Sequence, residues 1–318
     1  MPPIIRVTFL LFLASIASIL RAQNDTDTIT NVYQLGELTI RGRAEGLDLE
    51  GFIHQVMEDT TFHQAFLNTK YHPHRVRSEL RVREKNESRS AYLYRRGHLV
   101  REGVRATLVL DSTAEQGRLR DKDGGMRYLT AEMYDDVFFP KGTWTANARI
   151  GSREQEIDRS SRFAKYKSEL KRFMFNPGQE IASVPLIGDK LALFDPKMVP
   201  FYDFTIDSGT RGGRSCWIFG AAAKDTINGR PADEDDTVIK RMRTWFDQRT
   251  MQVIAREYRI AHTSLLLDFD ITIKVDNSLL NEALVPVLVE YDGQWDLPFK
   301  KPEVVRFYLL MDEWRIVP

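Results

Sequence analysis

Histidines gather in the first third of the chain, where His54, His63, His72, His74 and His98 make up five of the six in the sequence. Imidazole is a ligand for zinc and copper and the commonest general base in enzymes. No HExxH or CxxC motif accompanies them, so the pattern favours surface or core histidines over a metal site. A hydrolase that uses His72 or His74 is kept as an alternative function.

Other catalytic signatures are missing from the sequence. The chain contains no G-x-S-x-G, no G-x-x-x-x-G-K-S and no G-x-G-x-x-G, the motifs of serine hydrolases, phosphate loops and dinucleotide sites. Its single cysteine, Cys216, lies in the segment 215–219, which has the composition of a strand interior and favours a buried structural thiol over a nucleophile. The sequence therefore predicts no catalytic residue and no cofactor, and a non-enzymatic protein is favoured.

Arginines are dense between residues 75 and 105. Arg75, Arg77, Arg81 and Arg83 alternate with apolar residues, so a strand there would present all four on one face. One hypothesis is contact with an anionic lipid surface. Cross-strand pairing with interleaved glutamates explains the same pattern without a ligand.

Bulky aromatic residues recur in the second half of the chain. If they line a space between a curved sheet and covering helices, they could hold an apolar ligand. A filled core is the alternative. The candidate cavity residues are Trp217, Phe219, Trp245, Phe246, Phe269, Trp295 and Phe307.

The elements that would position these residues follow from the hydrophobic period. Helical spacing predicts helices near residues 48–68, 128–139 and 160–176. The first has an apolar stripe that includes Phe52, Ile53 and Val56, and Asp59-Thr60-Thr61 is expected to interrupt it and to cap a second short helix. Alternation with a period of two predicts strands, in which Val76, Ser78, Leu80 and Val82 share a face. We expect an α+β protein with one large, curved antiparallel sheet, open or half-barrel-like, and helices packed on one face. The predicted strands are 32–41, 74–83, 90–95, 104–111, 201–207, 215–223, 240–246, 252–261, 265–275, 284–291 and 304–311.

Residues 1–22 have the layout of a secretory signal peptide, with Arg6 before an apolar run and Ala22 at the expected cleavage point. Residues 23–47 are then a leader with a first strand, and 48–318 are a single β-rich domain. The predicted location is the periplasm or the outer-membrane periphery. With 45 basic and 45 acidic residues, the chain lacks the basic excess of a general nucleic-acid binder, so no nucleic-acid partner is expected.

The segment 242–254, MRTWFDQRTMQVI, resembles the strand–turn–strand pattern W-[IVF]-D-x-x-T-x-x-[IVP] of periplasmic lipoprotein-carrier proteins through Trp245, Asp247 and Thr250. We expect Asp247 to start the turn by accepting backbone N–H bonds, and Trp245 and Val253 to face the same side. The resemblance implies an unclosed half-barrel with a helical lid that holds acyl chains. The whole chain also resembles uncharacterised exported proteins of Gram-negative bacteria.

Together these observations predict a non-enzymatic periplasmic protein that binds a lipid or another apolar or amphipathic ligand in envelope biogenesis. The first alternative is a scaffolding module that binds an envelope protein through a sheet edge or the arginine-rich face. The second is a hydrolase with an unrecognised site.

Overall fold

The computed structural model describes residues 31–35, 38–42, 47–147, 189–263, 268–296 and 301–317. The chain divides into two compact units, Met1–Asn31 and Val32–Pro318, and the elements below belong to the second, apart from the first residue of the first strand. The predicted signal peptide, residues 23–30 of the leader and the helix predicted at 160–176 lie outside the described residues.

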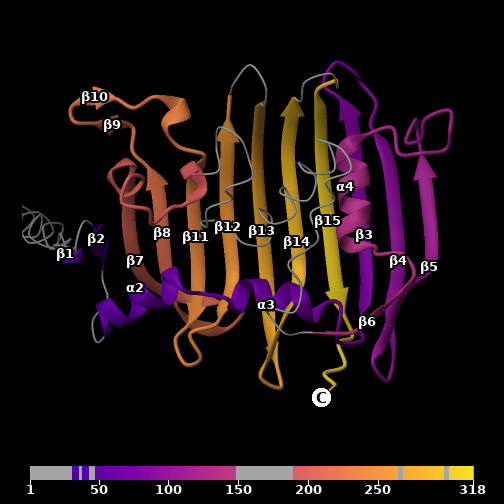
Figure 1. Cartoon of the computed structure of the whole chain (residues 1–318), viewed down its shortest axis with the longest axis horizontal. Helices are drawn as coiled ribbons and strands as arrows, with labels where there is room; N and C mark the ends of the chain where they lie inside the picture. Colours follow the sequence, from indigo (N-terminus) through magenta and orange to yellow (C-terminus); the bar gives the residue numbers. More distant parts are fainter. Residues whose placement is uncertain are drawn as a thin grey trace, which may run out of the picture. The chain divides into compact units, whose positions relative to one another are not determined.

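One large open sheet dominates the described residues (Figure 1). Its thirteen strands are β1 (Asn31–Leu35), β2 (Leu38–Gly42), β3 (Arg75–Glu84), β4 (Ala91–Glu102), β5 (Arg105–Gln116), β6 (Thr143–Thr145), β7 (Tyr202–Arg211), β8 (Arg214–Ala223), β11 (Ile239–Asp247), β12 (Val253–His262), β13 (Asp268–Leu280), β14 (Ala283–Asp296) and β15 (Glu303–Asp312). Their order is β1-β2-β7-β8-β11-β12-β13-β14-β15-β3-β4-β5-β6, so β1 and β6 are the two edges. The short strands β9 (Thr226–Ile227) and β10 (Arg230–Pro231) form a separate hairpin.

The expected α+β fold with an open sheet is confirmed, with one difference in strand direction. The pairs from β7 through β6 are antiparallel, as predicted. β2 runs parallel to β7, with Ile40 opposite Phe204, which makes the sheet mixed. The two strands are far apart in sequence, so no tight hairpin forces them to be antiparallel.

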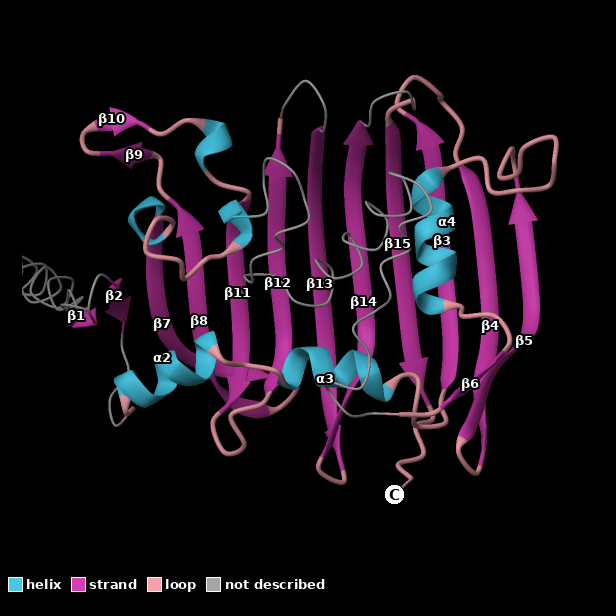
Figure 2. Ribbon diagram, in the orientation of Figure 1, coloured by secondary structure: helices cyan, strands magenta, loops and turns pink. Residues whose placement is uncertain are grey.

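The helices α2 (Leu49–Met57), α3 (Thr61–Asn68) and α4 (Leu129–Phe138) lie on one face of the sheet, as expected (Figure 2). We call this the inner face and the opposite one the outer face. On β3 the inner face carries Val76, Ser78, Leu80 and Val82, each at most 3 % exposed. Short 3-10 turns, η1 (Asp189–Leu191), η2 (Val199–Phe201) and η3 (Glu234–Asp236), complete the described helical elements.

Local side chains explain why the predicted helix at 48–68 is divided in two. Asp48 caps the start of α2 by accepting the Gly51 N–H at 3.2 Å. The carboxylate of Asp59 accepts the N–H of Thr61 at 3.0 Å and its hydroxyl at 2.6 Å, which starts α3. Phe52, Ile53 and Val56 of α2 are buried, in agreement with the predicted apolar stripe.

The first turn of α4 is capped by a residue distant in sequence. Glu303, the first residue of β15, accepts the N–H groups of Leu129 and Thr130 at 2.8 and 3.0 Å and the Thr130 hydroxyl at 2.6 Å. A carboxylate at a helix N-terminus satisfies unpaired N–H groups and opposes the positive end of the helix dipole. Glu303 therefore fixes α4 over the sheet.

Candidate functional site on the inner sheet face

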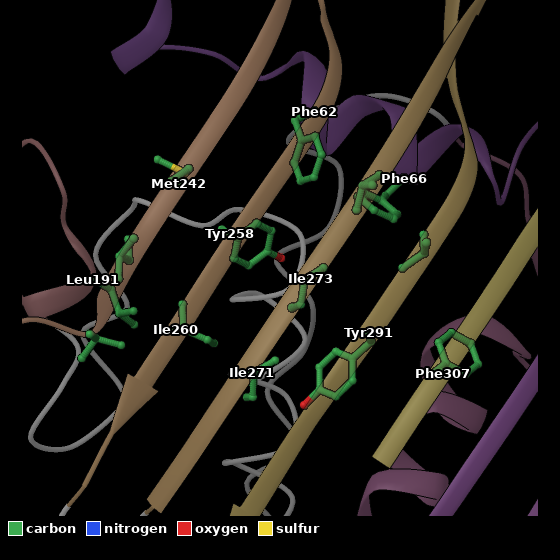
Figure 3. Close-up of a cluster of buried hydrophobic side chains, with 14 of the residues drawn as sticks. Phe62, Phe66, Leu191, Met242, Tyr258, Ile260, Ile271, Ile273, Tyr291 and Phe307 are labelled. Carbon is green, nitrogen blue, oxygen red and sulfur yellow. The ribbon is translucent and has the colours of Figure 1, made fainter. Parts of the chain in front are cut away.

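An apolar row crosses the inner face from β7 to β4. Its nine residues are successive cross-strand partners, so their side chains all project to the same side. Figure 3 shows Met242, Tyr258, Ile273, Tyr291 and Phe307 projecting from adjacent strands toward one layer. The row consists of Phe204, Ala221, Met242, Tyr258, Ile273, Tyr291, Phe307, Leu80 and Leu93, each at most 4 % exposed.

Most of the predicted cavity aromatics lie on this face. Phe219, Phe246, Phe269, Trp295 and Phe307 belong to the main apolar cluster, and Trp217 is half-buried against it. Trp245 does not join them: it lies in a second cluster with Cys216 and Ile218. The structure thus brings six of the seven together and separates one.

Alternation along β11 places Trp245 and Phe246 on opposite faces, and a β-bulge on β12 sets the face of Val253. Trp245 pairs with Ala255, whereas the next residue, Phe246, pairs with Val253. One extra residue on β12 shifts the register there, so Val253 shares a face with Phe246 and not with Trp245. The prediction that Trp245 and Val253 face the same side is therefore wrong, because strict alternation does not hold across a bulge.

On the outer face, Trp245 is covered by arginine. The guanidinium groups of Arg211 and Arg243 lie 4.7 and 5.0 Å from its ring. Arg211 also bonds to Asp276, with 2.9 Å between its Nε and an aspartate oxygen. The predicted role of Asp247 is confirmed, since its Oδ1 accepts the N–H groups of residues 249 and 250 at 3.0 and 2.9 Å.

Two buried arginines on the inner face connect helices to the sheet. Arg256 of β12 lies 3.5 Å from the carboxylate of Asp59, next to the start of α3, and donates to Thr244 Oγ1 at 3.1 Å. Its guanidinium also lies over the Phe62 ring at 4.4 Å. Burial lowers the pKa of Arg256, and the Asp59 charge opposes that effect. The pair joins α3 to β12.

The second connection joins α4 to β4. Arg95 forms an ion pair with Asp135 of α4, and their side chains are only 8 and 6 % exposed. The guanidinium also lies 5.2 Å from the centre of the Phe139 ring. Above the apolar row, the ring of Tyr134 stacks on Phe307 at 4.4 Å. Neither arginine was singled out from the sequence, because a charged residue in an alternating strand predicts the solvent face.

A small apolar pocket of about 30 Å³ lies between α4, β6 and the strands β3, β4, β5 and β15. Phe138 and Trp144 border it on the helix side, and Leu309 and Met311 on the sheet side. Polar groups of Thr69, Lys70 and His74 stand at its border. Its remaining lining residues are Val76, Leu99, Leu108, Val137 and Pro140.

The histidines proposed for a hydrolase make structural contacts. His74 is buried and stacks on Trp314 at 4.0 Å, and its Nδ1–H donates to the His72 carbonyl at 2.8 Å. Burial lowers the pKa of His74 to about 4. His72 Nδ1 accepts the Val317 N–H at 3.2 Å. The described residues contain no cluster of His, Cys, Asp and Glu suited to hold a metal ion.

Cys216 and the arginines of β3 also have local explanations. Cys216 is fully buried on β8, and burial raises the pKa of its thiol. Arg75 pairs with Glu313 at 2.7 Å and Arg77 with Asp312 at 3.5 Å. Arg81 lies over the ring of Tyr92, while Arg83 donates to the carbonyls of residues 84, 85 and 87. All four predicted arginines therefore have partners within the chain.

These features define an α+β protein whose open sheet buries one apolar face under helices. No protein-family model matches the chain, and no curated protein matches it. Among the described helices, none has the length and hydropathy needed to cross a membrane.

Solved structures give three likenesses at low identity. The first is a DUF1329 family protein from Desulfovibrio piger, at 11 % identity and a TM-score of 0.21, covering 80 % of this chain and 91 % of that one. The second is described as an outer membrane lipoprotein-sorting protein domain from Vibrio parahaemolyticus, at 10 % identity and a TM-score of 0.25, covering 81 % and 92 %. The third is lipovitellin, at 5 % and 0.27, covering 78 % of this chain and 25 % of that one. At these TM-scores none of the three bears on what the chain does.

Proposed function

We propose that the protein is a non-enzymatic binding protein of the cell envelope that takes an acyl chain or similar apolar group between α4 and the inner sheet face. The apolar pocket under α4 carries this proposal, because it is lined by aliphatic and aromatic side chains and continues the core of the sheet. Export to the periplasm, through the signal peptide predicted at residues 1–22, belongs to the same proposal.

The geometry suggests how such a ligand would enter. The present volume of about 30 Å³ holds little more than one water molecule. An acyl chain therefore requires α4 and the segment around Trp144 to move away from the sheet. Of the aromatics predicted from the sequence, Phe307 would then extend the apolar wall, because its ring lies 5.2 Å from that of Phe138.

The first test is native mass spectrometry of the purified protein together with organic extraction. A stoichiometric lipid-sized adduct supports carriage of a lipid. A fluorescent fatty acid then measures affinity. Val137→Trp fills the pocket and should weaken binding by at least about ten-fold, or about 1.4 kcal/mol. The matched control is Tyr308→Trp, which introduces the same indole ring at an exposed position on the outer face, away from the pocket.

Two outcomes would contradict the proposal. One is a protein without an adduct that also fails to bind the fluorescent fatty acid. The other is a folded Val137→Trp variant that binds as tightly as the control. Either result would favour the alternative function, a scaffolding module that binds an envelope protein.

One observation favours that second function. β6 pairs only with residues 105–107 of β5, so among the described strands residues 108–116 have a neighbour on one side only. Val109 and Leu110 are 41 and 45 % exposed on this edge. An edge of this kind can pair with a strand of another protein. Leu110→Pro should abolish a crosslinked envelope partner while leaving fatty-acid binding unchanged.

A further inference from the structure

A second pocket, of about 580 Å³, lies at the end of the sheet where β3 begins. Four arginines line it: Arg75 from β3, Arg96 and Arg101 from β4, and Arg315 from the segment after β15. That segment is held in place because the Arg315 N–H donates to the Pro73 carbonyl at 2.8 Å. Residues from three parts of the chain thus converge on one hollow.

The acidic groups in this pocket are already engaged. Glu313 lies 2.7 Å from Arg75, and an oxygen of Asp111 lies 2.8 Å from His98 Nδ1. Arg96 and Arg315 are exposed and form no ion pair with a carboxylate of the described residues. With four arginines against two carboxylates, the pocket carries an excess of about two positive charges at neutral pH if histidine is uncharged.

The strand register adds an unfavourable contact that an anion would relieve. Arg96 of β4 is the direct cross-strand partner of Arg77 of β3. Like charges directly opposite each other destabilise a strand pair. Asp312, 3.5 Å from Arg77, offsets only one of the two charges. An anion bound beside Arg96 would offset the other.

We propose that this pocket binds a phosphate group, with Arg96 and Arg315 as its principal donors. A guanidinium donates two parallel N–H bonds to two phosphate oxygens, which lysine cannot do. Arg101 contributes charge from a fixed position, since its Nε donates to the Gly103 carbonyl at 2.9 Å and its guanidinium lies 3.9 Å from the centre of the Tyr71 ring.

The phosphate could be free or could belong to a lipid headgroup. His74 and Leu99 line both this pocket and the apolar pocket under α4, so the two are neighbours. They lie on opposite faces of the sheet, because Arg75 and Arg96 alternate with the inner-face residues Val76 and Gly97. The phosphate site itself does not depend on the proposed acyl-chain function.

The test is titration calorimetry at low ionic strength with two probes, inorganic phosphate and the short-chain lipid dihexanoyl phosphatidic acid. In the variant Arg96→Gln/Arg315→Gln, phosphate affinity should fall by at least about ten-fold. The control Arg259→Gln/Arg306→Gln removes the same charge from outer-face arginines that pair with Asp270 and Asp292. It should bind within about two-fold of the original protein.

Tighter binding of the lipid than of inorganic phosphate would identify a headgroup site, and equal binding would identify a site for free phosphate. Absence of saturable binding of both probes at millimolar concentration would overturn the proposal. So would an equal loss in the two double variants. Phosphate should also raise the melting temperature of the original protein and the control but not of Arg96→Gln/Arg315→Gln, which shows in the same scan that each variant is folded.

Discussion

Arg95 of β4 and Asp135 of α4 form an ion pair on the inner sheet face, and both side chains are less than a tenth exposed. Removing one partner leaves an uncompensated buried charge, whereas replacing both by apolar residues of similar volume does not. Together with the Glu303 cap, the pair holds α4 on the sheet, and substitutions of the two residues test that role.

We expect Asp135→Ala to lower the free energy of unfolding by about 3–5 kcal/mol, because Arg95 would lose its buried counter-charge. The double variant Arg95→Met/Asp135→Leu should recover most of that loss. Urea unfolding followed by circular dichroism measures both. A double variant no more stable than Asp135→Ala would show that the pair does not act as a unit.

Glu303→Ala should destabilise α4 locally. The three hydrogen bonds that Glu303 accepts from Leu129 and Thr130 would be lost, and the cost of a lost helix cap is about 0.5–2 kcal/mol. Hydrogen exchange should become faster across residues 129–138. Asp292→Ala, which removes an exposed carboxylate paired with Arg306, is the control and should leave exchange in α4 unchanged.

Stability should fall below neutral pH because of His74. Its pKa is about 4 in the folded protein and near 6.5 when exposed, so between these values the unfolded chain binds more protons. The folded state then loses about 3 kcal/mol as the pH falls from 6.5 to 4, and nothing from this group above 6.5.

The variant His74→Phe keeps the ring next to Trp314 and removes this titration. The unfolding free energies of the original protein and of His74→Phe, each measured at pH 7 and at pH 4.5, show how much of the pH dependence comes from His74. A pH dependence as steep in His74→Phe as in the original protein would contradict the assignment to His74. His54→Phe, which replaces an exposed imidazole, controls for the substitution itself.

Cys216 should resist thiol reagents in the folded state. It is 0 % exposed, burial raises the pKa of its thiol, and its Sγ lies 3.2 Å from the Arg214 carbonyl oxygen. Because the thiolate is the reactive form, modification by a disulfide reagent should require unfolding. The measurement compares labelling rates in buffer and in urea, and equal rates would show that β8 opens readily.

Local patterns were sufficient for much of this protein. The period of two in residues 74–83 identified β3 and the residues on its inner face, because alternation follows from strand geometry. The roles of Asp59 at the start of α3 and of Asp247 in the turn between β11 and β12 were also predictable, since both carboxylates bond to N–H groups two or three residues away. An open sheet with helices on one face followed from the same periods.

Contacts between distant residues were decided only by the tertiary structure. Alternation predicted that Arg95 and Arg256 would face solvent, like other charged residues in strands. Folding instead buries both and brings Asp135 and Asp59 beside them, which compensates their charges. Glu303 reaches α4 across 173 residues, and one bulge on β12 turns Val253 away from the face that carries Trp245. A sequence period reports the backbone next to a residue, whereas register and counter-charge depend on which strands and helices pack together.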